Sequence, residues 1–122
     1  MRPNSVVILV SDGLARDFLA GWCRDRGISV AWADDRTDIV EAIAATDAGA
    51  LITDRLHRIG FRRISIEELR THCPGIRIVA VPVRGYLEGD MERLAMVVGA
   101  DEILADPRAP EAGRKPPERG GT

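Results

Sequence analysis

Five short apolar runs alternate with segments of helical periodicity, and this alternation constrains the fold more than any other feature. The runs lie at residues 5–13, 28–32, 49–54, 76–83 and 101–104. Each run is too short for a helix, so we predict strands that are buried on both faces. Apolar stripes at helical spacing lie between them, at residues 14–27, 38–44, 66–73 and 91–98.

Strands that alternate with helices imply right-handed crossovers and a parallel sheet covered on both faces. We therefore predict an α/β protein with a flavodoxin-like, doubly wound, five-stranded parallel sheet of order 2-1-3-4-5. At 122 residues and 13.3 kDa the chain fits one hydrophobic core. We expect one domain over residues 1–107.

The chain changes character after the last strand. Residues 106–122 hold four of the seven prolines together with several glycines, and they show no apolar stripe. Such a composition cannot bury enough apolar surface to become ordered. We expect a disordered tail over residues 108–122 and no regular fifth helix.

Three helix starts are predicted from capping signals. Thr37 followed by Asp38 is typical of an N-cap with an acid in the first turn. Ser65 and Glu68 have the spacing of a capping box, and Asp90 precedes the last apolar stripe.

Composition excludes several classes of function. The net charge of -2 and the pI near 5.7 give no basic footprint, so we do not expect DNA binding. No apolar run approaches the ~20 residues of a membrane span, and we expect a cytoplasmic protein. Cys23 and Cys73 lie outside any metal-binding spacing and are predicted to be buried thiols. We expect no enzyme, because the sequence shows neither a nucleophile with its base nor a glycine-rich nucleotide loop.

Two aspartates end neighbouring strands of the predicted sheet. Asp12 follows the first run and Asp54 ends the third. In this winding both lie at the carboxyl edge, beside the point where the strand order reverses, so we expect them to converge. Two like charges are unfavourable together unless a cation joins them, and Mg²⁺ prefers such oxygen ligands. The alternative is that each aspartate caps the segment that follows it.

The segments 6–13, 49–54, 76–83 and 99–107 resemble, in order and spacing, the receiver domains of two-component response regulators. The resemblance implies that Asp54 stands where that family accepts a phosphoryl group from a histidine kinase. It also implies a Mg²⁺ site made by Asp12, Asp54 and the backbone carbonyl of Leu56. The expected partner is a histidine kinase or a downstream effector protein.

Four positions depart from the family pattern. Ser11 stands where the family has the first of two acids, and Pro82 stands where it has a Thr or Ser hydroxyl. Asp106 replaces the family's lysine, and Ile103 replaces its switch aromatic. The phosphorylation switch is therefore predicted to be degraded.

Electrostatics point the same way. A phosphorylated side chain carries roughly -1.5 to -2, and a like charge 4 Å away costs on the order of 4 kcal/mol at an effective dielectric of 20. Asp106 would oppose that charge, whereas Arg55 or Arg84 can supply the missing cation. A cluster of Asp12, Asp54 and Asp106 would instead favour a divalent ion.

Three interpretations stay open. The chain is a receiver-like signalling protein with a working phosphoacceptor, or a pseudo-receiver that acts as a dimerisation or partner-binding module. The absent fifth helix would leave an apolar face for a second copy or another protein. The third interpretation is a sensor of anions or cyclic dinucleotides that uses the basic loop 55–63. Its arginines are Arg55, Arg58, Arg62 and Arg63.

Overall fold

The computed structural model of the chain describes residues 2–81, 93 and 100–103. Apart from residue 93, the predicted helix at residues 91–98 lies outside these residues, as does the predicted tail. So do Pro82, Arg84 and Asp106, for which the sequence expectations stay predictions.

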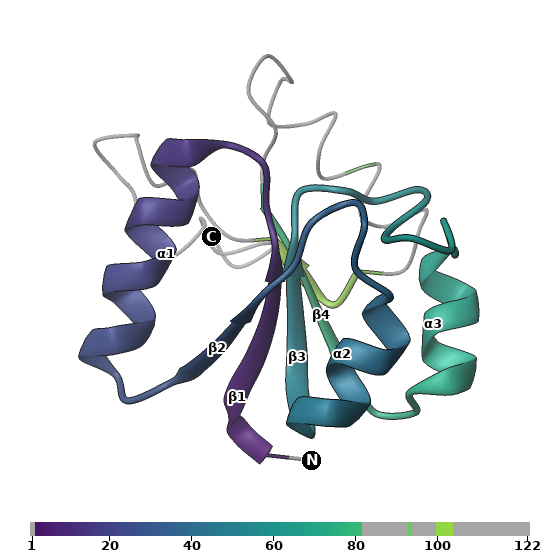
Figure 1. The fold of residues 1–122 in the computed structure, drawn as a ribbon, viewed down its shortest axis with the longest axis horizontal. Helices are drawn as coiled ribbons and strands as arrows, with labels where there is room; N and C mark the ends of the chain where they lie inside the picture. Colours follow the sequence, from purple (N-terminus) through teal and green to yellow (C-terminus); the bar gives the residue numbers. More distant parts are fainter. Residues whose placement is uncertain (1, 82–92, 94–99, 104–122) are drawn as a thin grey trace, which may run out of the picture.

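Five parallel strands form one sheet, as Figure 1 shows. The strands are β1 (Arg2–Leu9), β2 (Ser29–Trp32), β3 (Ala48–Thr53), β4 (Arg77–Ala80) and β5 (Glu102–Ile103). Their order is β2-β1-β3-β4-β5, and every neighbouring pair is parallel. The predicted flavodoxin-like sheet and its strand order are confirmed.

Helices cover both faces of this sheet. They are α1 (Gly13–Asp25), α2 (Ile39–Thr46) and α3 (Ile66–His72). In Figure 1, α1 lies on one face, and α2 and α3 lie on the other. Among the described residues, no helix has the length and apolar character needed to cross a bilayer.

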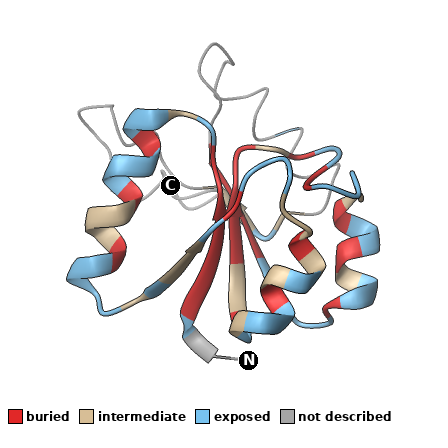
Figure 2. Cartoon of the chain, in the orientation of Figure 1, coloured by how far each residue is buried: buried red, intermediate tan, exposed pale blue. Residues whose placement is uncertain are grey.

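The central strand β1 contributes side chains to two separate hydrophobic cores. Val7 and Leu9 pack in the layer of α2 and α3, whereas Val6 and Ile8 pack in the layer of α1. Figure 2 shows the result as buried central strands between helices that are buried on one side only. Each fully buried side chain of this size contributes about 1.5–3 kcal/mol relative to leaving it in water. The two-sided burial predicted from the sequence is therefore what holds the sheet.

Each layer contains one cysteine. Cys23 of α1 packs in the α1 layer, and Cys73 at the end of α3 packs in the other. Both are free and buried, as predicted. Burial raises the pKa of both thiols, which keeps them protonated and unreactive.

The predicted capping box starts α3. The Glu68 N–H donates to Ser65 Oγ at 3.1 Å, and the Ser65 N–H donates to Glu68 Oε1 at 2.9 Å. The Ser65 N–H is the main reason that the pKa of Glu68 lies below its usual value. This helix start is confirmed as a reciprocal pair of bonds.

The predicted cap of α2 is wrong by one residue. Asp38, not Thr37, is the N-cap, and its carboxylate accepts from the Glu41 N–H at 3.2 Å. The Thr37 hydroxyl instead donates to Asp34 Oδ1 at 3.2 Å. Asp34 also accepts from the Arg36 N–H, and that bond is the largest cause of its lowered pKa. The Thr37 hydroxyl is therefore bonded within the turn at Asp34 and does not cap α2.

The segment between β3 and α3 is fastened to the start of α2. Ile59 and Ile64 form an antiparallel bridge, which closes a tight turn between them. At the tip of this turn, the Phe61 N–H donates to the Thr37 carbonyl at 2.7 Å. Gly60 has a φ of +72°, the left-handed region in which a side chain is strained. The turn therefore needs glycine for its backbone and for its close approach to α2.

We predict that Gly60→Ala destabilises the fold by about 2–4 kcal/mol, from left-handed strain and overpacking together. A Cβ on Gly60 would lie 2.6 Å from Ile39 Cγ1 and 2.6 Å from the Thr37 carbonyl oxygen. Urea unfolding measures the loss. Gly21→Ala, in the middle of α1 with only the flexible Arg24 nearby at 3.5 Å, is the control and should gain about 0.5–1 kcal/mol. Equal effects of the two substitutions would contradict this account.

Candidate functional site

Asp54 stands directly after β3 and is held by the sheet itself. Its N–H donates to the Leu9 carbonyl at the end of β1, at 3.2 Å, and so extends the ladder by one bond. The chain then turns at once, because the Arg55 N–H bonds the hydroxyl of the fully buried Thr53 at 2.9 Å. Asp54 is only 8% exposed. Its carboxylate is therefore a fixed, buried anion at the carboxyl edge of the sheet.

Ser11 supplies two hydrogen bonds to this anion. Its N–H donates to Asp54 Oδ2 at 3.0 Å, and its hydroxyl donates to the same oxygen at 3.2 Å. Hydrogen bonds to a carboxylate are stronger than those between neutral groups. The sequence showed Ser11 only as a missing acid. The structure shows it as a donor that stabilises Asp54.

Arg55 lies against the other carboxylate oxygen. Its Nε is 3.6 Å from Asp54 Oδ1, which is a charge contact too long for a hydrogen bond. Oδ1 accordingly has no hydrogen-bond partner among the described residues. Arg55 Nη2 donates to Ser11 Oγ at 3.3 Å and lies 3.2 Å from Asp35 Oδ2. The ion pair of Arg55 with Asp35 was not predicted, because spacing along the sequence does not show which arginine contacts which acid.

Asp12 is turned toward its own helix. Its carboxylate accepts from the Leu14 N–H at 3.2 Å as the N-cap of α1. Asp54 itself accepts from Ser11 and lies against Arg55, and the expected convergence of Asp12 with Asp54 stays a prediction. Helix capping, the alternative weighed for Asp12, describes its geometry.

The described residues do not fit a resident Mg²⁺ as they are arranged. Mg²⁺ needs near-octahedral oxygen ligands, usually one or two carboxylates together with waters. Asp54 Oδ1 has no hydrogen-bond partner among the described residues, but a guanidinium lies 3.6 Å from it, and Oδ1 of Asp12 is directed to the N–H of Leu14 as a helix cap. No group of three or more His, Cys, Asp or Glu residues gathers in the described part of the chain. The predicted role of the Leu56 carbonyl stays a prediction.

The basic loop does not form a single cradle for an anion. Three of its four arginines are paired with acids of this chain, namely Arg55 with Asp35, Arg58 with Glu68 at 3.5 Å, and Arg62 with Asp38 at 2.7 Å. Arg63 has a left-handed backbone with φ of 52°. The pairs point to three different parts of the fold, so the geometry gives the anion-sensor interpretation no support.

Solved structures of similar architecture include receiver domains of response regulators. The chemotaxis protein CheY4 of Vibrio cholerae matches with a TM-score of 0.64 at 18% identity, over 90% of this chain and 92% of that one. The receiver domain of the stress response regulator RcsB from Escherichia coli matches with a TM-score of 0.64 at 16% identity, over 84% and 81%. The chain has the receiver-domain fold. A response regulator receiver protein from Pseudomonas putida matches this receiver fold with a TM-score of 0.57 at 20% identity, over 85% and 86%.

The comparison that supports the predicted resemblance to receiver domains is the one with solved structures. No protein-family model matches the sequence, and no curated protein does. The role of each residue in the site must therefore be argued from this chain's own geometry. In this fold Asp54 follows β3 directly, and the residue that bonds it from the segment after β1 is Ser11.

We predict that Ser11→Asp destabilises the protein at neutral pH by about 1–2 kcal/mol, allowing for solvent screening. The new carboxylate would face Asp54 Oδ2 from the position of a hydroxyl now 3.2 Å away. Thermal unfolding measures the loss, and acid or Mg²⁺ should reduce it by removing or bridging a charge. Ser11→Asn is the neutral control of equal size. A loss that is the same for both variants would show that charge is not the cause.

Proposed function

We propose that this chain is a receiver-like signal-transduction protein of the two-component type, which acts by protein–protein contact and has a degraded phosphorylation switch at Asp54. The receiver fold supports the family-level role. One observation carries the rest: the Asp54 carboxylate is buried and is bonded by Ser11 of the same chain, where the family pattern has the first of its two acids.

Phosphorylation of Asp54 would add negative charge to a site that offers few groups to stabilise it. A carboxylate oxygen of Asp54 would attack phosphorus, forming an O–P bond, while the bond to the donor breaks and the leaving group takes its electron pair. The product carries roughly -1.5 to -2 charges, which preorganised cations and donors must stabilise. Oδ2 is already bonded to Ser11, and Oδ1 lies against Arg55. Arg55 is the one described cation beside the carboxylate.

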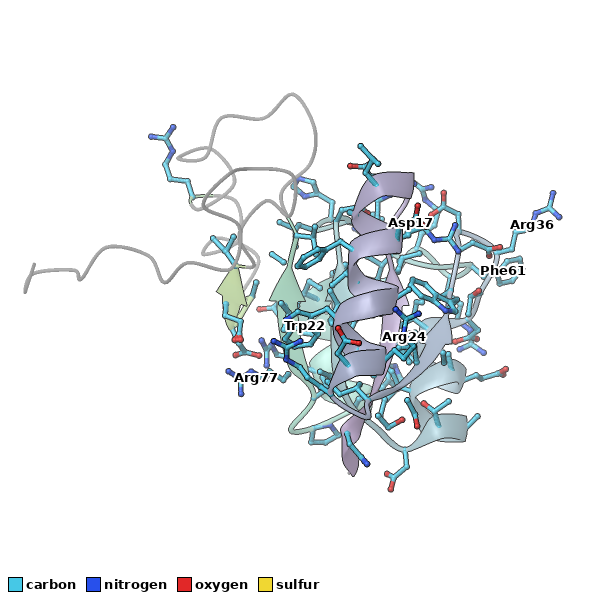
Figure 3. All side chains as sticks on the ribbon, turned by 90° about the vertical axis from the view of Figure 1, so that its left-hand side faces the viewer. Asp17, Trp22, Arg24, Arg36, Phe61 and Arg77 are labelled. Carbon is cyan, nitrogen blue, oxygen red and sulfur yellow. The ribbon has the colours of Figure 1, made fainter. Side chains whose placement is uncertain are left out.

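The alternative function, a phosphorylation-independent pseudo-receiver, is favoured by a stripe on α1. Leu14, Phe18 and Trp22 recur at intervals of four residues, and Leu14 and Phe18 are 54% and 36% exposed. Figure 3 shows Trp22 on the side of α1 nearest Arg77 of β4, away from Arg24. Exposed apolar stripes on helices are suited to contact with a second copy or a partner. A pseudo-receiver of this kind would act by binding a protein partner and would not need a kinase.

The first test is intact-protein mass after incubation with Mg²⁺ and acetyl phosphate. We expect the wild type to gain no phosphoryl group. A variant that combines Ser11→Asp, Pro82→Thr and Asp106→Lys restores the family residues at three of the four departing positions and should gain one, unless Asp54→Asn is added. A gain in the wild type that Asp54→Asn abolishes would overturn the degraded switch and make the chain a conventional receiver.

The second test concerns the stripe on α1. We predict that the wild type self-associates at micromolar concentration and that Phe18→Glu shifts it toward monomer, because a charge cannot be buried in an apolar contact. Sedimentation equilibrium measures the mass. Asp17→Asn, which changes an exposed neighbour of the stripe, is the control. A wild type that stays monomeric and does not bind a dye for exposed apolar surface would rule out the dimer.

A further inference from the structure

We propose that the Arg55 guanidinium takes the place of the divalent cation in this receiver fold, so that the chain holds its buried carboxylate and ties three loops together without metal. The inference rests on the proposed function, because it concerns the same Asp54 site. It adds a role for one residue that neither the fold nor the family pattern assigns.

The contacts of Arg55 span three separate connections of the sheet. Ser11 follows β1, Asp35 follows β2, and Arg55 itself follows β3. Nη2 reaches Ser11 Oγ at 3.3 Å and Asp35 Oδ2 at 3.2 Å, while Nε lies 3.6 Å from Asp54 Oδ1. A guanidinium presents several N–H groups in a fixed plane, so one side chain can serve several oxygens. The segments that follow β1, β2 and β3 are therefore joined through one cation.

Burial makes this cation necessary. The Asp54 side chain is 7% exposed, and a carboxylate removed from water needs an opposite charge as well as hydrogen bonds. Ser11 supplies the hydrogen bonds on Oδ2 but carries no charge. Arg55 supplies the charge beside Oδ1, and its backbone is anchored by the bond to the buried Thr53.

Arg55 and Mg²⁺ would compete for the same oxygen. Mg²⁺ binds carboxylate oxygens at ~2.0–2.1 Å, so an ion on Oδ1 would lie next to the guanidinium and be repelled by it. Metal binding therefore requires that Arg55 leave. The Arg55 side chain is 40% exposed, so solvent and ions reach this edge of the sheet when the side chain is replaced.

The test compares Mg²⁺ binding by Arg55→Met with that of the wild type, without a phosphoryl donor. MgCl₂ is titrated by calorimetry, and melting is measured in EDTA and in Mg²⁺. We expect the wild type to melt at the same temperature in both. Arg55→Met should melt lower in EDTA, recover in Mg²⁺, and bind the ion at least ~10-fold more tightly than the wild type, which is ~1.4 kcal/mol.

Arg58→Met is the matched control, because Arg58 lies in the same loop but pairs with Glu68 away from the site. It should behave like the wild type. If Arg55→Met does not fold, Arg55→Lys keeps a cation and should stay independent of metal. The backbone amide of Ser11, followed by NMR during the wild-type titration, then reports directly on the bond to Asp54 Oδ2.

Equal Mg²⁺ affinities of wild type and Arg55→Met would overturn the inference, as would a shift of the Ser11 amide with saturable Mg²⁺ binding in the wild type. These outcomes are independent of the phosphorylation test. A wild type that gains a phosphoryl group would overturn the proposed function, whereas the order of the two affinities would still decide whether Arg55 excludes the ion.

Discussion

The parallel pairing of β1 with β3 is the constraint on which the rest of the structure depends. The ladder runs from Val6 and Ala50 to Leu9 and Thr53, and both strands are buried on both faces. Because the strands end in register, the next residues of each must meet. The position of Asp54 is therefore set by the sheet and not by loop conformations, which is the property a fixed buried anion requires.

The buried carboxylate of Asp54 must also be neutralised. A sheet edge that buries a carboxylate can neutralise it with an ion taken from solution or with a side chain of its own. An ion that comes and goes can couple the site to a signal. A built-in side chain gives one permanent arrangement, which suits a protein whose output is a constant surface. The role proposed above for Arg55, argued from its contacts and those of Ser11, corresponds to the second case.

Sequence patterns predicted the strand order and the capping box at Ser65, because buried runs and cap spacing are properties of consecutive residues. They did not predict the start of α2, where the Thr37 hydroxyl bonds the turn at Asp34 instead of the helix. For Asp12 they left two uses open, a metal ligand or a helix cap, and the structure shows the cap. The topology places a residue at an edge of the sheet, but the direction of its side chain follows from local competition for donors. The ion pair of Arg55 with Asp35 joins two loops that are distant in the sequence, so residue spacing does not predict it.

The distribution of the two cysteines has a consequence for how the fold opens. Cys23 lies on one side of the sheet and Cys73 on the other, and each is sealed in its own layer. A thiol reagent can reach either one only when that layer parts from the strands. The protein thus contains two chemical reporters, and their separate labelling rates distinguish the loosening of α1 from the loosening of the opposite layer.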